Sequence, residues 1–531
     1  MRHAQPAFLN ILTERPRLSA LALGLLSATG FQPLGLWPVA LVAMGLFGLI
    51  VADAPNWKSV LWRGWLFGWA HFTVSNNWIA KAFTFQAEMP EVLGWFAVPL
   101  LAIYLAVYPA IAAGFARAVV KSERGLAFAL ALGAGWIVTE WLRGWVFTGY
   151  AWNPFAMVLL GPFDRPGLAA MAPVMGTYAA SGLAVFVSVA AMQMLRARQW
   201  FAGAIVAALL TIGMYLPPVA PREGTLAVTL VQPNIPQPDI SDVTKFETNY
   251  ARLAMQTRRA ASQDGRRLVL WPESGMSDYL RDGYPQRFYA RTTAMGSPSY
   301  ARRRLGATIG EGSALLTGAI ELEIGADETG RIRALAARNA VIALDHSGEI
   351  LGGYSKAELV PYGEYLPMRS LLEPLGLSRL VPGAIDFWPG PGPQTLDLGE
   401  YGRASPQICY EIIFPGQVTY RADRPDFIYN PSSEGWFGSF GPPQFMAQAR
   451  MRAIEEGLPV LRATTTGISA VIDARGVVRH YLGMYVAGRI DTVVPPAASA
   501  TPFARFGNAL SLFWAVLFLA AALVAMRRQP R

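Results

Sequence analysis

Residues 126–146 form one long apolar run, which reads LAFALALGAGWIVTEWLRGWV. A helix needs about 20 mainly apolar residues to cross the hydrocarbon core of a bilayer, and this run is long enough. Seven further apolar runs lie on either side of it, so we expect a polytopic α-helical membrane bundle of about eight transmembrane helices. The eight runs cover residues 18–34, 35–52, 63–83, 92–116, 126–146, 167–195, 199–217 and 506–526.

The composition of the whole chain favours the same architecture. Of the 531 residues, 53% are apolar and 15% are charged, whereas about 25% are charged in an ordinary soluble domain. A soluble single domain is therefore excluded. The net charge is +9, but the basic residues flank apolar runs and form no stripe with interleaved aromatic residues, so we expect no nucleic-acid partner. One cysteine and four histidines exclude an intrachain disulfide and a thiolate zinc cluster, and we expect no metal or organic cofactor.

The short loops and chain ends differ in their content of lysine and arginine. Successive loops between the apolar runs must lie on opposite sides of the membrane. The loops and chain ends on one side contain thirteen basic residues, whereas those on the other side contain only Lys81, Arg143 and Arg165. Positive residues are retained on the cytoplasmic side of a membrane. We therefore predict that both termini are cytoplasmic and that the long segment between the seventh and eighth runs is extracytoplasmic.

That long segment reads as an α/β domain. Apolar runs typical of strands alternate with polar helical stretches at 245–262 and 442–457. Pro-rich stretches at 216–221 and 495–502 would connect it to the flanking helices. We predict a membrane domain over 1–217 with seven transmembrane helices, an extracytoplasmic domain over 218–502, and an eighth helix with a basic tail over 503–531. The expected strands include Leu226–Val231, Leu268–Trp271, Leu315–Ile320 and Ala340–Leu344.

Lysine is rare in this chain, since only five of the 45 basic residues are lysines. A lysine in the external domain therefore suggests a need for a compact ammonium group that can exchange protons. Lys356 follows a strand-like run in Tyr354-Ser355-Lys356 and is a candidate for such a role, although a structural lysine is equally consistent with its position. Lys245 lies in a polar helical stretch, and we expect it to be a solvated charge.

Two carboxylates occupy positions that suit acid–base chemistry. Glu273 follows an apolar strand in Trp271-Pro272-Glu273, where partial desolvation would raise its pKa. Glu364 lies in an aromatic turn at 361–367 and is either a positioning group or a simple turn residue. An ordinary loop glutamate is the alternative interpretation of Glu273.

Cys409 is the only cysteine, and it lies where a strand-like run meets a turn or a helix. Such a junction can present a side chain at the edge of a sheet. A buried structural cysteine is the alternative, because free cysteines are among the most buried residues. As a nucleophile Cys409 would need a base, and a carboxylate would have to supply it, since no histidine lies in a comparable motif.

Taken in chain order, these residues form a recognisable set. They are Trp-Pro-Glu at 271–273, Tyr-Ser-Lys-Ala-Glu-Leu-Val-Pro-Tyr-Gly-Glu-Tyr at 354–365, and Cys-Tyr-Glu at 409–411. This set resembles the Glu-Lys-Cys triad of the nitrilase superfamily. Together with the apolar runs, the chain resembles the apolipoprotein N-acyltransferase family over essentially its whole length. The resemblance implies a nitrilase-like α-β-β-α sandwich for the external domain.

The resemblance also implies roles for individual residues. Cys409 would be the acyl-accepting nucleophile, Glu273 the general base, and Lys356 the cation that supports the oxyanion. Supporting residues that orient this triad or control access to it would be Glu364, Tyr410 and Glu411. The substrate pocket or its lid would include Glu434, Trp436, Phe437 and Trp152. The partners implied are a phospholipid acyl donor, a diacylglyceryl apolipoprotein as acceptor and the bilayer. The protein would be a monomer in the bacterial cytoplasmic (inner) membrane, with its catalytic domain on the periplasmic side.

The chain departs from the family pattern near the expected pocket. Ser433 and Glu434 stand where the family usually has an Asn-Asp pair, Phe445 stands where histidine is common, and Thr465 stands where asparagine is expected. None of these changes removes a member of the triad. They leave open whether the pocket loops tune or impair activity.

Two alternatives to an acyltransferase remain from sequence alone. The same triad would serve a membrane-tethered amidase, because the triad does not distinguish transfer from hydrolysis. A protein of another class, a non-catalytic lipoprotein-binding receptor or scaffold, is also consistent with the altered loops. The retention of Glu273, Lys356 and Cys409 together favours an enzyme.

Overall fold

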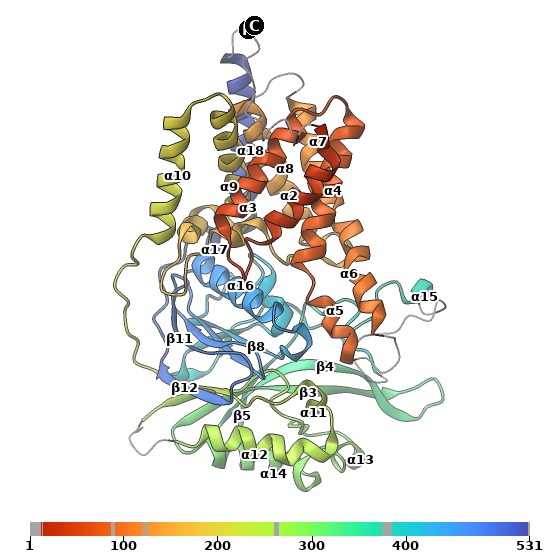
Figure 1. The fold of residues 1–531 in the computed structure, drawn as a ribbon. Coiled ribbons are helices and arrows are strands. Elements are labelled where there is room, and N and C mark those ends of the chain that lie inside the picture. The colour runs from red at the N-terminus through yellow and green to blue at the C-terminus, as the bar shows by residue number, and fades with distance from the viewer. Residues whose placement is uncertain are drawn as a thin grey trace, which may run out of the picture.

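The computed structural model describes residues 12, 14–85, 91–120, 125–259, 265–372, 374 and 385–528. Figure 1 shows two layers of structure, with a bundle of helices on one side and an α/β domain on the other. The bundle contains helices from both the first part of the chain and its last described residues. The α/β domain lies between them in the sequence.

Each of the eight apolar runs contains a helix. The helices of the bundle are α2 (Pro16–Ala28), α3 (Trp37–Ala52), α4 (Trp57–Ser75), α6 (Val92–Leu105), α7 (Val107–Val119), α8 (Leu126–Arg143), α9 (Ala172–Arg196), α10 (Trp200–Tyr215) and α18 (Asn508–Arg528). Among the described residues, four helical segments are long and apolar enough to cross a membrane, namely Val92–Val119, Leu126–Arg143, Leu168–Arg196 and Asn508–Arg528. The number of eight spans stays a prediction.

Small residues let the helices of the bundle pack closely. A Cβ atom added at Gly64 of α4 would lie 2.7 Å from the Cα of Ala110, and one added at Gly68 would lie 2.9 Å from the Cα of Ala106. These distances are too short for a side chain, so the α4 backbone lies directly against α7. Such close approach at small residues is a common way for membrane helices to associate.

The α/β domain contains two six-stranded sheets. The first has the strand order β12-β1-β2-β3-β4-β5 and the second has the order β11-β10-β9-β8-β7-β6. Strands β1, β2 and β3 are parallel, as are β7, β8 and β9. The first sheet comprises β1 (Ala227–Gln232), β2 (Arg267–Leu270), β3 (Ser313–Ala326), β4 (Ile332–Asp345), β5 (Ile350–Ser355) and β12 (Gly488–Val493). The second comprises β6 (Leu396–Asp397), β7 (Arg403–Pro406), β8 (Phe427–Ser432), β9 (Val460–Thr464), β10 (Ser469–Ile472) and β11 (Val478–Leu482).

Helices cover the outer faces of both sheets, so the predicted α-β-β-α layering is confirmed. One apolar core fills the space between the sheets, and a second joins the first sheet to α12 (Phe246–Thr257) and α14 (Pro298–Ile309). The second sheet is covered by α16 (Gly441–Glu456). The four predicted strands and the two predicted helical stretches all correspond to elements, but β3 and β4 are much longer than the predicted runs 315–320 and 340–344. Residues 260–262 of the first predicted helical stretch lie outside the described residues.

Helix α16 lies between the second sheet and the bundle (Figure 1). Its residues Phe445 and Ala449 belong to the same apolar cluster as the two sheets, while Met451 belongs to the core of the bundle. Since one helix contributes to both cores, the α/β domain is packed directly onto the bundle. The connection does not depend on flexible tethers alone.

Buried charged side chains of α16 strengthen this junction. The guanidinium group of Arg450 donates to the carbonyl oxygens of Gly161, Pro162 and Arg165 in a loop of the bundle, each at 2.8 Å. Further along, Glu455 accepts a hydrogen bond from the backbone N–H of Thr177. That residue follows a break in α9 at Gly176, where φ is +76°. The break exposes backbone groups that need partners, and α16 supplies one.

Candidate functional site

Glu273 lies just beyond the end of β2 and is held by two hydrogen bonds. Its Oε1 accepts from Asn339 Nδ2 at 2.7 Å, and its Oε2 accepts from the backbone N–H of Ser433 at 2.7 Å. The side chain is in the interior, with the residue 6% exposed. Burial raises the pKa of this carboxyl group above its usual value, and the nearby Lys356 ammonium opposes that rise. A carboxylate with a raised pKa is suited to accept a proton near neutral pH.

Lys356 follows β5 and is also enclosed, with 1% of the residue exposed. Its Nζ donates to Glu364 Oε1 at 2.9 Å and lies 4.0 Å from Glu273 Oε1. Burial alone would lower the pKa of Lys356, but the carboxylates of Glu364 and Glu273 raise it above the ordinary value. The ammonium group therefore keeps its charge, and two acids fix its position.

Cys409 follows β7 and begins the short 3-10 helix η9 (Cys409–Ile413). Its backbone has φ +50°, in the left-handed region that a residue with a side chain seldom adopts. The predicted junction between a strand and a turn or helix is confirmed. Strain of this kind is often found where a side chain must be presented at a functional site. Burial, and next the Glu273 carboxylate, raise the pKa of the Cys409 thiol to about 12, while Lys356 acts in the opposite direction. The three predicted triad residues thus share one buried electrostatic environment.

Glu411 joins the lysine segment to the cysteine turn. Its Oε1 accepts from the Tyr354 hydroxyl at 2.6 Å and from the backbone N–H of Ala357 at 2.7 Å, and its Oε2 accepts from the backbone N–H of Ile408 at 2.7 Å. Burial raises the pKa of Glu411 to about 7. This single carboxylate therefore holds the residues that follow Lys356 and the residue that precedes Cys409.

Asn339 of β4 was not singled out from the sequence, yet it contacts both acids beside Lys356. Its Nδ2 donates to Glu273 Oε1 at 2.7 Å and to Glu364 Oε1 at 3.1 Å, and its carbonyl oxygen accepts from the backbone N–H of Lys356 at 2.8 Å. The signal in the sequence was an asparagine immediately before the apolar run Ala340–Leu344. An amide there needs a polar partner.

Arg462 of β9 was also missed, and it forms a buried ion pair with Glu434. The same guanidinium group donates to Asn430 Oδ1, and its central carbon lies 5.1 Å from the centre of the Phe445 ring. Burial lowers the pKa of Arg462 to about 9, and the charges of Cys409 and Glu273 oppose this. Glu434, predicted to belong to the pocket or its lid, lies in the interior, where its charge is paired with that of Arg462.

Trp152, Phe437 and Phe445 belong to one aromatic cluster between the bundle and the second sheet. Trp152 is completely buried, its Nε1 donates to Gln444 Oε1 at 2.7 Å, and its ring centre lies 4.6 Å from that of Phe445. Phe437 lies 5.2 Å from Phe445 between ring centres. Trp436 is only partly buried. Trp152 and Phe445 are therefore packing residues of the junction, whereas Trp436 is nearer the surface.

The remaining departures from the family pattern contact one another. The hydroxyl of Thr465 lies 3.4 Å from that of Ser433, whose backbone N–H is bonded to Glu273.

Tyr410, another predicted supporting residue, donates from its hydroxyl to the carbonyl oxygen of Gly149 at 3.3 Å. Tyr410 thus connects the turn that bears Cys409 to the bundle.

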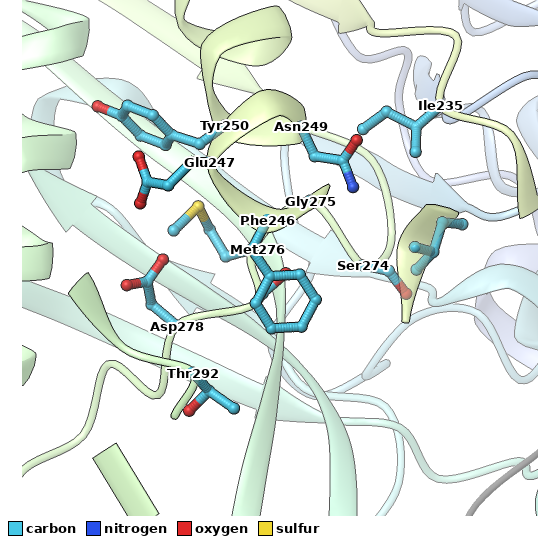
Figure 2. Close-up of a pocket in the computed structure, with 12 residues that line it drawn as sticks. Ile235, Phe246, Glu247, Asn249, Tyr250, Ser274, Gly275, Met276, Asp278 and Thr292 are labelled. Carbon is cyan, nitrogen blue, oxygen red and sulfur yellow. The ribbon is translucent and has the colours of Figure 1, made fainter. Parts of the chain in front are cut away.

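A small cavity lies on the outer side of the first sheet, and Figure 2 shows the residues around it. Ser274 and Gly275, which follow Glu273, line it together with Asn249 and Tyr250 of α12. Its volume of about 20 Å³ is enough for a single water molecule.

Within the described ranges, no group of three or more histidine, cysteine, aspartate or glutamate residues could hold a metal ion.

The arrangement can carry out nucleophilic catalysis. A thiol, a carboxylate and a fixed ammonium group occur together, and the carboxylate is positioned by two donors. Such a carboxylate can remove the proton of the thiol or of an attacking amine, while the ammonium group stabilises negative charge on a carbonyl oxygen. The site is enclosed, which strengthens these electrostatic interactions.

Comparison with known proteins gives two family matches. Residues 23–190 match the apolipoprotein N-acyltransferase N-terminal domain, and residues 227–482 match carbon-nitrogen hydrolase. The chain is 31% identical to an apolipoprotein N-acyltransferase of Rhodopseudomonas palustris, over 96% of this chain and 95% of the relative. It is 33% identical to one of Bradyrhizobium diazoefficiens with the same coverage. Among solved structures, Nit3 of Saccharomyces cerevisiae, a member of branch 10 of the nitrilase superfamily, is 21% identical with a TM-score of 0.36, over 52% of this chain and 93% of that one.

Proposed function

The chain belongs to the apolipoprotein N-acyltransferase family, and from that membership we propose how its residues transfer a fatty acyl chain to the N-terminal amine of a lipoprotein. The enzyme is an acyltransferase whose catalytic domain is nitrilase-like. The acyl donor is a phospholipid, the acceptor carries a diacylglyceryl cysteine, and the acyl group passes through a thioester on Cys409. The observation that supports this mechanism is the shared buried environment of Glu273, Lys356 and Cys409.

In the first half-reaction the sulfur of Cys409 attacks the ester carbonyl carbon of the phospholipid. Glu273 takes the thiol proton as the carbon–sulfur bond forms, and Lys356 stabilises the negative charge on the carbonyl oxygen. When the ester bond breaks, Glu273 returns the proton to the departing oxygen. The products are an acyl-enzyme and a lysophospholipid.

In the second half-reaction the N-terminal amine of the acceptor attacks the thioester. A carbon–nitrogen bond forms, the carbon–sulfur bond breaks, and Glu273 carries the amine proton to the cysteine sulfur. Glu364 and Glu411 are positioning residues for Lys356 and for the cysteine turn. Tyr410 keeps that turn against the bundle. Trp436 and Phe437 contribute to the lid, and the packing of Trp152 and Glu434 positions the residues beneath it.

The membrane arrangement completes the proposal. The chain crosses the bacterial inner membrane eight times, with seven spans in residues 1–217, a periplasmic catalytic domain over 218–502, and the last span and tail over 503–531. The uneven distribution of lysine and arginine supports cytoplasmic termini. Lateral diffusion in the outer leaflet then brings both lipid substrates to one monomer.

Intact-protein mass spectrometry tests the first half-reaction. The detergent-purified protein is incubated with phosphatidylethanolamine, alongside Cys409→Ala, and a portion is treated with hydroxylamine. We expect an increase of one acyl group in the wild type that hydroxylamine removes and that the variant lacks. A well-folded wild-type protein that forms no adduct with any lipid offered would contradict the mechanism and favour an amidase or a receptor.

A further inference from the structure

Glu358 lies two residues after Lys356 and takes no part in the mechanism above. Its backbone N–H donates to Glu411 Oε1 at 3.2 Å, and the N–H of Ala357 donates to the same oxygen at 2.7 Å. Glu411 also holds the residue before Cys409 through its other oxygen. The main chain at Glu358 is therefore fixed beside the cysteine turn.

The carboxylate of Glu358 differs from the other acids around the site. Glu273, Glu364, Glu411 and Glu434 each accept hydrogen bonds or pair with a cation. In the part of the chain that the structure describes, the Glu358 carboxylate does neither, although the residue is partly buried. Burial raises the pKa of this group, and no neighbouring cation offsets the effect. A partly desolvated carboxylate is strongly stabilised by a donor that binds to it.

The surroundings of Glu358 connect the catalytic domain to the rim of the bundle. Burial, and next the Glu358 carboxylate, raise the pKa of Tyr410 and of Tyr365, so both hydroxyls are within its electrostatic reach. The Tyr410 hydroxyl donates to the carbonyl oxygen of Gly149. In the same loop Phe147 is 77% exposed and the nearby Trp145 is 54% exposed. Exposed aromatic side chains are typical of the level of lipid head groups.

We propose that Glu358 binds the primary ammonium group of a substrate at the approach to Cys409. Lys356, two residues before Glu358, is already paired with Glu364, so the unpaired acid selects a positive ligand from outside the chain. An ammonium group offers three donors to a carboxylate, so it can satisfy both oxygens of Glu358. This inference rests on the proposed function, whose two substrates both carry such a group when the donor is phosphatidylethanolamine.

The ammonium group has two sources, the ethanolamine head group of the donor and the N-terminus of the acceptor. The experiment compares the wild type with Glu358→Gln, which keeps the shape of the side chain and removes its charge. Glu349→Gln is the matched control, because Glu349 is exposed and precedes the other end of β5. Glu358→Asp tests whether restoring the charge restores binding.

Each half-reaction is measured with a partner that carries an ammonium group and with one that does not. Thioester formation is followed by intact mass with phosphatidylethanolamine and with phosphatidylglycerol. The preformed thioester is then chased with an amine-terminated diacylglyceryl lipopeptide or with hydroxylamine, which is uncharged at neutral pH. Losing a hydrogen bond to a charged group corresponds to about a tenfold or greater loss of affinity.

We expect Glu358→Gln to raise the KM for the ammonium-bearing partner about tenfold or more in one half-reaction. The KM for the partner without an ammonium group in the same half-reaction should change much less. A selective loss with phosphatidylethanolamine identifies the head group, and a selective loss with the lipopeptide identifies the acceptor. Glu358→Asp should recover part of the loss, and Glu349→Gln should match the wild type. Equal effects on charged and uncharged partners, or no effect in either half-reaction, overturn the inference. A wild type that forms no thioester would instead contradict the proposed function itself.

Discussion

Replacement of Asn339 by leucine tests whether the base is positioned and tuned from β4. The substitution removes the Nδ2 that donates to Glu273 at 2.7 Å and to Glu364 at 3.1 Å. It leaves the carbonyl oxygen that holds the backbone of Lys356. A hydrogen bond to a charged group contributes about 1.5–3 kcal/mol. Loss of the bond to Glu273 should therefore slow thioester formation roughly tenfold to hundredfold.

The change should appear in the pH dependence as well as in the rate. Burial already raises the pKa of Glu273, and the Asn339 hydrogen bond opposes that rise by stabilising the charged form. Without it the pKa of Glu273 rises further, because the charged form loses a donor. Since the base works only when ionised, activity increases as the pH passes upward through this pKa. The variant should therefore lose activity at neutral pH and regain part of it at higher pH.

The assay is the rate of thioester formation, measured by intact mass at a series of pH values. Arg333→Gln, at the exposed far end of the same strand, is the control and should follow the wild-type profile. A rate that falls while the profile stays in place would show that Asn339 only supports the local structure. A rate within twofold of the wild type would refute the reasoning altogether.

Two further predictions concern the thiol and the junction. Because Glu273 takes the Cys409 proton in the proposed mechanism, Glu273→Gln should be alkylated by iodoacetamide more slowly than the wild type and should lose acyl transfer; alkylation at the wild-type rate would contradict the assignment of Glu273 as the base. Arg450→Met should leave the carbonyl oxygens of the buried residues Gly161 and Gly476 without this donor, at about 1–3 kcal/mol for a buried group left unsatisfied. We expect a lower melting temperature by differential scanning fluorimetry, with Arg475→Met, exposed in the β10–β11 turn, as the control; equal melting temperatures would contradict a structural role for the junction.

Local sequence patterns were sufficient to predict four of the strands and the setting of the cysteine. The runs at 226–231, 268–271, 315–320 and 340–344 are apolar because their strands are buried in the sheets. Lys356 was informative because arginine supplies almost every other positive charge in the chain. The order of Trp-Pro-Glu, Tyr-x-Lys and Cys-Tyr-Glu then indicated which residues meet, although they are far apart in the sequence.

The partners of the acids could not be predicted in the same way. Arg462 and Glu434 belong to different segments, and either could be a solvated charge when it is considered alone. They meet because β8 and β9 are neighbouring parallel strands, which no local pattern specifies. Phe445 then has a physical reason to replace a histidine, since its ring lies against the Arg462 guanidinium group and the ring of Trp152. The pairing of Glu434 with Arg462 in the interior is likewise not indicated by its own segment of sequence.

The burial of the site bears on the choice between transfer and hydrolysis. Cys409 and Glu273 are 5% and 6% exposed, and Lys356 is 1% exposed. A thioester in such a place is protected from bulk water, whereas an amidase must admit water to complete each cycle. Helix α16 packs the catalytic domain onto the bundle, and Tyr410 links the cysteine turn to the loop that follows α8. The turn that bears Cys409 therefore lies against the helices of the bundle, and such a placement is expected of an acyltransferase whose substrates are held in a membrane.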